Sequence, residues 1–463
     1  MNISNMKKFL LVPAVVLVVL TPAFAQKQTP PEGAAPKPFT VPKSETYALA
    51  NGMKVTLVPY GIIPKAAVSV MIEAGSVNEG KGHGGVAGIT GELLKEGTAQ
   101  WTSQQLGEET ARMGSSLGVS VNADRTDVEM DVLQEFAPDA VKVLADVLEH
   151  PRLPESELAR LKNDSLRQIA LQLSQPQTIA AARFRKLLYG EHPYGTIVPA
   201  EEDIKKITIQ DVKDFYAGNF GAQRGHLYIA GKFDSAAVKK AIEASFGAWP
   251  KGPARVEMTP KPVAHKVLDV TDRPGAPQST LIVGLPVVGP TSPDAIPLIV
   301  TNALLGGSFN SRITANIREQ KGYTYSPSSE ISRRYHDAYW AQHADVTTKF
   351  TGPSLKEIFA EIERLQKEPP TAVELKGIQS YLSGLFVIQN SNRTAVIGQL
   401  QNVDFQGLGS DYLKTYVQKV NAVTPADVQR LTAQYLKPEL MTTVVVGDKS
   451  KIDEQLKPFG TEK

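Results

Sequence analysis

The sequence predicts an α+β fold built from two homologous αβ halves, each a mostly antiparallel sheet covered by helices. The phrases at 207–215 and 423–431 match, and the β-rich segments after them end in Gly231 and Gly447, all at one offset of 216 residues. A constant offset across a helix, a loop and a strand indicates two copies of one fold. Long helices outnumber the strands, and hairpins replace strict βαβ alternation, which favours the α+β class.

Length and composition fit this division. The 463 residues exceed what one hydrophobic core usually supports. With 42% hydrophobic and 21% charged residues, the chain has the composition of an ordinary globular protein. Two repeats of about 200 residues can each bury a large core.

The first 25 residues predict a secretory signal peptide. Lys7 and Lys8 precede an apolar stretch at 9–20, and the small residues Ala23 and Ala25 follow it. That stretch is too short for a membrane-spanning helix, and no later apolar run is long enough for one, so no membrane span is expected. We expect a soluble periplasmic or secreted protein, with residues 26–43, rich in Pro, Ala, Lys and Gly, as a flexible tether.

Charge and cysteine content exclude several classes of function. Without residues 1–25 the chain carries 48 basic and 48 acidic side chains, which gives no electrostatic argument for nucleic acid or anionic membranes. The chain has no cysteine, which excludes disulfides, thiolate metal sites and cysteine nucleophiles.

The first domain is predicted at 44–249. It begins with the clearest short signal in the chain, Asn51-Gly52 between two β-rich runs, which indicates a hairpin. Further strands are expected at 66–74, 117–122 and 126–133, and helices at 85–94, 103–113, 138–149, 155–173 and 179–188.

A Pro-rich linker is predicted at 250–264, and the second domain at 265–460. The second domain repeats the order of the first. We expect strands at 279–285, 325–332 and 338–346, and helices at 295–305, 313–320, 355–366, 372–390 and 394–403.

Three motifs add a family resemblance: GGSFNSR at 306–312, IREQKGYTYS at 317–326 and HPYG at 192–195. With the duplication, they resemble the pitrilysin/insulinase-type peptidases, which include mitochondrial processing peptidase and small bacterial two-subunit members. The resemblance covers about residues 45 to 460. It implies that the two domains make half of a clamshell, and that a second half, from the same or another chain, closes over an extended peptide.

Active members of that family carry His-x-x-Glu-His on a first-half helix. The two histidines bind zinc and the glutamate is the general base. Here the matching stretch is 85–98, and its flanking Gly-x-Ala and Gly-Thr place Gly88 and Glu92 at the histidine positions and Gly91 at the base. All three family residues are therefore missing.

The family's third zinc ligand is a glutamate on a downstream helix, where this chain offers Arg167 or Gln168. Neither residue suits zinc. His83, five residues before the first ligand position, has no partner at helical spacing and is interpreted as a solvated loop residue. We expect no metal or other cofactor in this chain, and zinc in a partner.

Arg318 and Tyr325 match a pair that the family keeps in its second half. Seven residues separate them, with Gly322 between. In the family this pair reaches into the zinc-bearing half, where it holds the substrate carbonyl and stabilises the developing oxyanion. The alternative is a surface arginine at a helix end and a strand tyrosine that packs its ring.

Two glycine-rich segments allow two interpretations each. Gly306-Gly307 indicates either a helix C-cap or, by the resemblance, a mobile loop that touches substrate. Residues 114–118 precede an edge strand to which active members add the peptide as an extra strand. Here this segment is either scaffold or a second peptide contact.

The resemblance implies a non-catalytic, substrate-positioning subunit that is inactive alone. It would form a heterodimer with a zinc-bearing homologous peptidase, together making one metalloendopeptidase. The alternative is a stand-alone peptide-binding or assembly protein. An active zinc peptidase with displaced ligands is a third interpretation, which the missing ligands disfavour.

Overall fold

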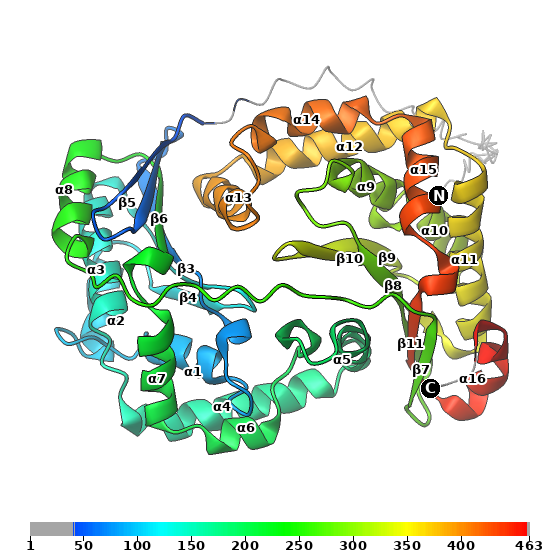
Figure 1. The fold of residues 1–463 in the computed structure, drawn as a ribbon, viewed down its shortest axis with the longest axis horizontal. Coiled ribbons are helices and arrows are strands. Elements are labelled where there is room, and N and C mark those ends of the chain that lie inside the picture. The colour runs from blue at the N-terminus through cyan, green and yellow to red at the C-terminus, as the bar shows by residue number, and fades with distance from the viewer. Residues whose placement is uncertain (1–39, 41, 461–463) are drawn as a thin grey trace, which may run out of the picture. The chain divides into compact units, whose positions relative to one another are not determined.

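The computed structural model of the protein describes residue 40 and residues 42–460. The predicted signal peptide and residues 26–39 and 41 of the predicted tether lie outside the described residues. The remainder forms one compact unit with two sheets (Figure 1).

The two sheets have the same strand order, and this confirms the duplication. The first sheet runs in the order β1 (Glu45–Ala48), β2 (Lys54–Pro59), β6 (Gly225–Gly231), β3 (Lys65–Ile72), β5 (Thr126–Leu133), β4 (Gly118–Val121). The second runs β7 (Val267–Asp272), β11 (Thr442–Gly447), β8 (Gln278–Val287), β10 (Asp337–Thr347), β9 (Ser328–Arg334). Strand by strand the second order repeats the first, without a counterpart of β1.

Both sheets are mostly antiparallel, as predicted, but each contains one parallel pair. β2 pairs with β6, and β7 with β11, in parallel. Each pair joins a strand near the start of its half to one near the end, so no local turn signals it. β1 and β2 form the hairpin expected around Asn51-Gly52.

The helices repeat as well. The first half contains α1 (Val86–Leu93), α2 (Ser103–Arg112), α3 (Ala137–Glu149), α4 (Glu155–Leu173), α5 (Pro176–Tyr189), α6 (Glu201–Lys206), α7 (Ile209–Asn219) and α8 (Ser235–Phe246). The second contains α9 (Ala295–Asn302), α10 (Arg312–Thr314), α11 (Thr351–Lys367), α12 (Ala372–Gln389), α13 (Arg393–Phe405), α14 (Tyr412–Ala422), α15 (Pro425–Tyr435) and α16 (Lys449–Leu456).

Two helices of the second half are shorter than predicted. α9 ends at Asn302 and continues as a π-helical segment, Ala303–Gly307. α10 continues as a second π-helical segment, Ala315–Gln320, which contains Arg318. π-Helical turns often occur at functional sites, and residue propensity alone does not distinguish them from α-helix.

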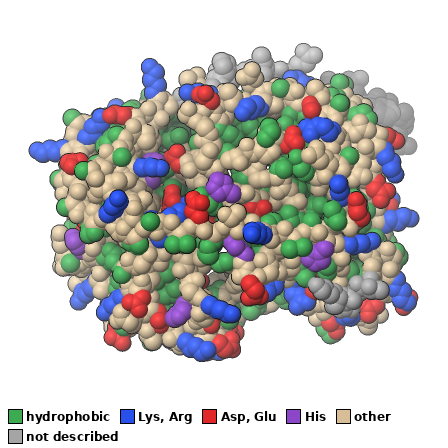
Figure 2. Space-filling model, in the orientation of Figure 1, with side chains coloured by type: hydrophobic (Ala, Val, Ile, Leu, Met, Phe, Trp, Pro, Cys, Tyr) green, Lys and Arg blue, Asp and Glu red, His purple; other side chains and the backbone are tan. Residues whose placement is uncertain are grey.

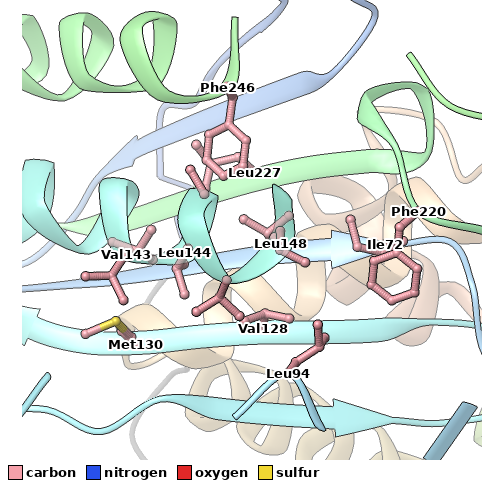
Figure 3. Packing of buried hydrophobic residues seen from close by; sticks show 14 of the residues in the cluster. Ile72, Leu94, Val128, Met130, Val143, Leu144, Leu148, Phe220, Leu227 and Phe246 are labelled. Atoms are coloured by element: carbon pink, nitrogen blue, oxygen red, sulfur yellow. The ribbon is translucent and has the colours of Figure 1, made fainter. Parts of the chain in front are cut away.

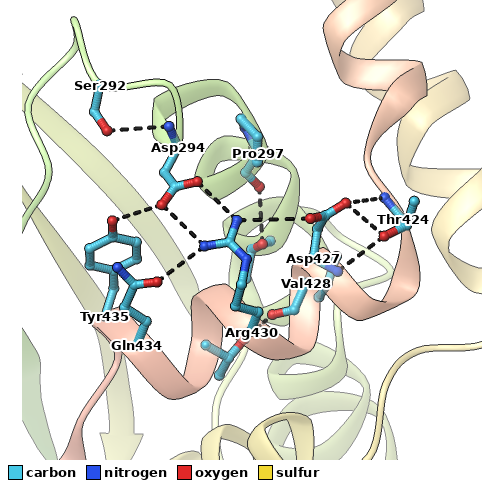
Figure 4. A network of polar contacts seen from close by, with 11 residues as sticks. Ser292, Asp294, Pro297, Thr424, Asp427, Val428, Arg430, Gln434 and Tyr435 are labelled. Atoms are coloured by element: carbon cyan, nitrogen blue, oxygen red, sulfur yellow. Dashed lines mark hydrogen bonds and ion pairs between the residues drawn. The ribbon is translucent and has the colours of Figure 1, made fainter.

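The repeated phrase folds into a capped helix in both halves, α7 and α15. The Thr208 hydroxyl accepts a hydrogen bond from the Asp211 backbone N–H, and the Asp211 carboxylate accepts from the Thr208 N–H. Thr424 and Asp427 form the same capping box. In α15, Arg430 extends the network, because its guanidinium lies 2.9 Å from Asp294, which also accepts from the Tyr435 hydroxyl (Figure 4).

Each sheet buries one face under helices of its own half. In the first half α3 lies on β3 and β5, with Leu144 and Leu148 against Val128 and Ile72 (Figure 3). In the second half Trp340 is fully buried in the equivalent core. These apolar layers hold the two sheets, since the described chain has no disulfide or metal site to assist them.

The other face of each sheet is covered by a helix from the opposite half. α5 packs on β8 and β11 through Ala180, Phe184 and Leu188. α13 packs on β3 and β6 through Val396 and Ile397. The two helices are counterparts in the duplication, so the halves exchange equivalent helices.

Charged pairs join the two halves at both exchanged helices. On α13 the Arg393 guanidinium binds both carboxylate oxygens of Asp131 at 2.6 Å. On α5 Arg183 binds both oxygens of the buried Asp269, at 2.9 and 2.5 Å. Such bidentate pairs fix the orientation of a helix as well as its position.

The predicted linker at 250–264 has no helix or strand, and its backbone is held at several points. The Arg224 guanidinium donates to the Ala254 carbonyl at 2.7 Å, and the Val263 N–H donates to the Leu188 carbonyl at 2.9 Å. Arg255 lies over the Tyr335 ring, 3.8 Å from its centroid. The residue limits of the two domains stay predictions.

The face of the molecule shown in Figure 2 has no preference for one sign of charge. On this face, basic and acidic side chains are interspersed. No helix in the described part of the chain has both the length and the apolar composition needed to cross a bilayer.

Candidate functional site

Helix α1 carries the positions that correspond to the missing zinc ligands. Its N-cap is Gly85, whose φ of 92° favours glycine. Gly88 and Glu92 are exposed, four residues apart, and so lie on one face. The Glu92 carboxylate lies 2.5 Å from the Lys95 ammonium, so the single acidic group on this face already has a cation beside it.

Gly91, at the position of the general base, is closed off by packing. It is buried, and a Cβ atom there would lie 2.5 Å from Cγ2 of Val121 on the edge strand β4. Valine is short and stiff at χ1, so it cannot swing away as a longer side chain could. The close approach of α1 to β4 therefore requires glycine and leaves no room for a glutamate.

The third ligand position, on α4, does not supply a metal ligand either. Gln168 is exposed, and the neighbouring Arg167 pairs with Asp164 at 2.5 Å. His83 has its imidazole half exposed, with Nδ1 3.5 Å from an Asp211 carboxylate oxygen. Across the described residues no group of three or more His, Cys, Asp or Glu side chains could hold a metal ion. The residues present do not fit zinc.

Glu79 holds the start of α1 and was not found by sequence reasoning. Its carboxylate accepts a hydrogen bond from the Ala87 N–H at 2.9 Å. Burial raises the pKa of Glu79 to about 7, against the lowering effect of hydrogen bonds from the Gly85 and Ala87 backbones. A carboxylate before a glycine-rich loop is not distinctive in sequence, since only its burial makes it unusual.

This carboxyl makes stability depend on pH. The folded protein binds the Glu79 proton more tightly than the unfolded chain, so between about pH 4.5 and 7 stability falls as pH rises. The rise from 4.5 to about 7, at about 1.36 kcal/mol per pKa unit, corresponds to roughly 3 kcal/mol for Glu79. We expect Glu79→Gln, which keeps a carbonyl acceptor but never ionises, to be more stable than the wild type at pH 8 and similar at pH 4.5.

Urea unfolding of both proteins at these two pH values measures the difference. Glu149 and Asp127, whose burial raises their pKa to about 7 and about 6, contribute equally to both proteins and cancel in the comparison. Parallel pH profiles for the wild type and Glu79→Gln would contradict this role of Glu79.

Arg318 and Tyr325 are presented to solvent by well-anchored segments. The Arg318 guanidinium carbon lies 4.4 Å from the centroid of the Phe309 ring, and its Nε lies 3.2 Å from Glu319. Tyr325 is 86% exposed, while the preceding Thr324 donates to the Asp345 carbonyl at 2.6 Å. The alternative in which Tyr325 packs its ring within a strand is therefore wrong.

Phe309 is a further residue that sequence reasoning missed. It is 62% exposed, and burying its ring is therefore not its structural role. A cation over an aromatic face is attracted to the ring electrons, so Phe309 restricts where the Arg318 guanidinium can lie. Its only sequence signal is its place between Gly307 and Arg312 in the motif.

The glycine pair before Phe309 is explained by packing. Gly306 is buried in the π-helical segment, where a Cβ atom would lie 2.5 Å from the Gln342 amide oxygen and 2.6 Å from the Ser329 hydroxyl. A Cβ atom at Gly307 would collide with the Asn302 amide. Contact with substrate at these two glycines stays a prediction.

The segment 114–118 precedes an edge strand, as expected. β4 is the last strand of the first sheet, and β9 holds the same place in the second. Gly114 has a φ of 70°, and the Ser115 hydroxyl accepts a hydrogen bond from the Asp131 N–H at 3.1 Å. This local hydrogen bonding favours a scaffold role for the segment.

The HPYG motif connects the two halves through Tyr194. The His192 imidazole caps the turn by accepting from the Tyr194 N–H, and the Tyr194 hydroxyl donates to Asp124 at 2.5 Å. The Tyr194 hydroxyl also accepts from the Tyr335 N–H of the second half at 3.1 Å.

Comparison with protein families gives two matches along the chain. Residues 61–198 match the model described as insulinase (peptidase family M16), and residues 206–382 match the model described as peptidase M16 inactive domain. The two matches follow one another, in agreement with the two αβ halves.

Known proteins resemble the chain over most of its length. The beta subunit of mitochondrial-processing peptidase from Saccharomyces cerevisiae is 22% identical, covering 89% of this chain and 93% of that protein. The non-peptidase homolog YmxG of Helicobacter pylori is 21% identical, with 84% and 90% covered. A crystal structure of a peptidase M16 inactive domain from Pseudomonas fluorescens superimposes with a TM-score of 0.81 at 25% identity, with 88% and 98% covered.

Proposed function

Because this chain belongs to the M16, or insulinase, family of peptidases, we propose that it is a subunit without its own catalytic centre which positions peptides for a zinc-bearing homologue. One contrast supports this proposal. The position of the general base is closed by Val121, whereas Arg318 and Tyr325 stay accessible on anchored segments.

In the proposed pair, this chain would donate hydrogen bonds to the reacting carbonyl. A guanidinium and a phenol are hydrogen-bond donors that stabilise negative charge as it develops on a carbonyl oxygen. Tyr325 is 86% exposed and its ring is not packed in the core, so its hydroxyl is available for this role. Phe309 would keep the Arg318 guanidinium from turning away. The zinc, the bound water and the general base would all come from the partner subunit.

Two features of the relatives and the sequence agree with this role. The mitochondrial relative is named as a subunit of its peptidase. By analogy, we propose that this chain also acts together with a partner subunit. Residues 1–25 have the pattern of a signal peptide, so we propose that the pair works in the periplasm or outside the cell.

The test is reconstitution with a zinc-bearing M16 homologue from the same organism. Each chain alone, and the two mixed, would be assayed with a fluorogenic peptide and by size-exclusion chromatography. We expect a 1:1 complex with activity only in the mixture. Arg318→Ala should lower kcat of the complex about 100-fold, as for loss of one oxyanion donor.

Matched controls separate this effect from general damage. Arg167→Ala removes an exposed arginine on α4, and Tyr381→Phe changes an exposed tyrosine on α12, so neither should alter kcat. Cleavage by this chain alone, or an unchanged kcat in Arg318→Ala, would overturn the proposal. Peptide binding without any peptidase partner would instead favour a stand-alone binding protein.

A further inference from the structure

Helix α12 presents an apolar face that the rest of the described chain leaves uncovered. Its other side packs on α14 and α9 in the core of the second half (Figure 1). The uncovered face carries three large side chains, Val373, Tyr381 and Ile388, which are 84%, 48% and 67% exposed. Lys376 is the one charged side chain among the exposed positions of this helix. A surface helix normally has charged residues on the side away from the core, so this face does not have the composition of one that meets only water.

The counterpart of α12 in the first half, α4, has a charged face at the same place. The buried residues of the two helices align in pairs: Leu158 with Leu375, Leu161 with Ile378, and Ile169 with Phe386. On the outer face of α4, Asp164 pairs with Arg160 at 3.3 Å and with Arg167 at 2.5 Å. The same alignment places Gly377 and Gly384 of α12 at the two arginine positions. One copy of the fold is therefore built for solvent at this face, and the other copy is not.

The packing of this chain does not require glycine at either of these two positions. A Cβ atom at Gly377 or Gly384 would meet no neighbouring group within 4 Å. Neither residue has a positive φ. Glycine inside a helix is destabilising relative to alanine, and its use elsewhere is to let another backbone come close. The two glycines are explained if a second polypeptide packs on α12.

The uncovered face is complementary to itself in an antiparallel arrangement. Its N-terminal part forms an open hollow, which is lined by Ala372, Val373, Lys376, Gly377 and Ser380. Its C-terminal part carries the protruding side chains of Tyr381 and Ile388. In an antiparallel pair of α12 helices that cross between Ser380 and Tyr381, these side chains of each copy would enter the hollow of the other.

The sequence of the helix fits this two-fold symmetry. The crossing pairs positions of the two copies as follows: Val373 with Ile388, Gly377 with Gly384, and Ser380 with Tyr381. The helices can thus approach closely on both sides of the crossing point. The two copies of Lys376 would lie about 13 Å apart along the helix axis, which is more than the Debye length of about 8 Å. Each Lys376 would face Leu385 of the other copy, so no like charges meet.

We propose that this face of α12 joins two copies of the chain in an antiparallel, two-fold symmetric dimer. In such a dimer the same patch of both subunits is buried, as the pairing above requires. The Tyr60 hydroxyl donates to the Asn390 carbonyl at 3.0 Å, so the exposed loop with Ile62 and Ile63 lies at the C-terminal end of α12 and extends the contact. The helix pair and the two loops would bury on the order of 1,000 Å², at the low end for specific interfaces. The dimer is therefore weak, with a Kd on the order of 10 µM.

The first test is the self-association of the full chain without its predicted signal peptide. Sedimentation velocity at protein concentrations from about 1 to 200 µM should show a monomer that converts to a dimer around the expected Kd. Gly384→Arg gives α12 the residue type that α4 has at Arg167, and should raise the Kd at least about tenfold, because the interface then contains two buried arginines without partners.

A matched control separates this effect from loss of the fold. Gly107→Arg introduces the same side chain on α2, where a Cβ atom also meets no neighbouring group within 4 Å, and should leave the Kd unchanged. Arginine is a better helix former than glycine. Thermal unfolding at about 1 µM, where both proteins are monomeric, should therefore show Gly384→Arg to be no less stable than the wild type.

The second test uses cysteine cross-linking to check the antiparallel pairing. The chain has no cysteine, so each single cysteine variant carries one thiol. Ser380→Cys lies at the crossing point and should form a dimer through a disulfide under mild oxidation. Val373→Cys should not cross-link to itself, because the two thiols would lie about 22 Å apart along the axis. A mixture of Val373→Cys and Ile388→Cys should form the mixed dimer.

Each outcome bears on the second copy as the occupant of this face. A chain that stays monomeric at 200 µM, or equal Kd values for Gly384→Arg and the wild type, would overturn the dimer. Self-cross-linking of Val373→Cys in preference to Ser380→Cys would overturn the antiparallel pairing. If Gly384→Arg abolished binding of a zinc-bearing homologue to a chain that does not self-associate, the occupant would be that homologue and the inference would fail.

The dimer and the proposed function can fail separately. A monomeric chain that still activates the zinc-bearing homologue through Arg318 would overturn only the dimer. A dimeric chain whose mixture with the homologue is inactive would overturn only the proposed function.

Discussion

Replacing Phe184 by alanine is expected to lower the free energy of unfolding by about 3–5 kcal/mol. Phe184 lies on α5 of the first half, is almost completely buried, and packs against the second sheet, with its ring 5.5 Å from that of Tyr339. Gly284 of β8 accommodates it, because a Cβ atom there would lie 2.7 Å from the Phe184 ring. The ion pair between Arg183 and Asp269 holds α5 in place, so the helix cannot move to fill the space that alanine leaves.

Equilibrium urea unfolding followed by circular dichroism measures this change. Leu171→Ala removes a large apolar side chain that is 58% exposed on α4, and should change stability by less than about 0.5 kcal/mol. A loss at Phe184 no greater than that at Leu171 would show that α5 contributes little to holding the halves together. If the two halves of Phe184→Ala unfolded in separate transitions, the result would show that α5 holds the halves together.

Restoring the zinc motif is expected to fail. Gly88→His, Gly91→Glu and Glu92→His together recreate the family's residue pattern, yet we expect no stoichiometric zinc in the purified protein. The side chain at position 91 would collide with Val121, and overpacking of this kind costs about 1–3 kcal/mol. Gln168 does not replace the third ligand, so a catalytic site with three protein ligands cannot form.

Metal analysis and urea unfolding check both parts of this prediction. The double variant Gly88→His, Glu92→His leaves Gly91 in place and changes only exposed positions, so its stability should stay within about 0.5 kcal/mol of the wild type. Adding Val121→Ala to the triple variant should recover part of the lost stability. One zinc per chain in the triple variant would show that α1 can move away from β4.

The fold was predictable because its strongest signals are repeated. The capping boxes at Thr208 and Thr424 are local hydrogen bonds that four consecutive residues determine, so the same residues specify the same helix start twice. The parallel pairs, such as β2 with β6, were not predictable, because they join segments more than 160 residues apart without a turn between them. The π-helical segments were missed for a different reason: residue propensity does not distinguish a π-helical turn from an α-helical one.

The candidate site was predictable only where it follows a motif. Arg318 and Tyr325 were identified by their spacing, and the structure adds that Phe309 holds the first and that the second is exposed. The lack of room for a side chain at Gly91 is due to Val121, thirty residues away in the sequence, so only the three-dimensional structure reveals it.

Because α5 and α13 each cover the sheet of the opposite half, neither half is a complete domain by itself. A half expressed alone would lack the helix that covers the inner face of its sheet, leaving Met71 and Ala67, or Ile282 and Val444, open to water. A chain with a single repeat would be complete only as a two-fold symmetric dimer, in which each subunit places this helix on the sheet of the other. The present chain has the architecture of such a dimer, with its two halves joined into one polypeptide by residues 250–264.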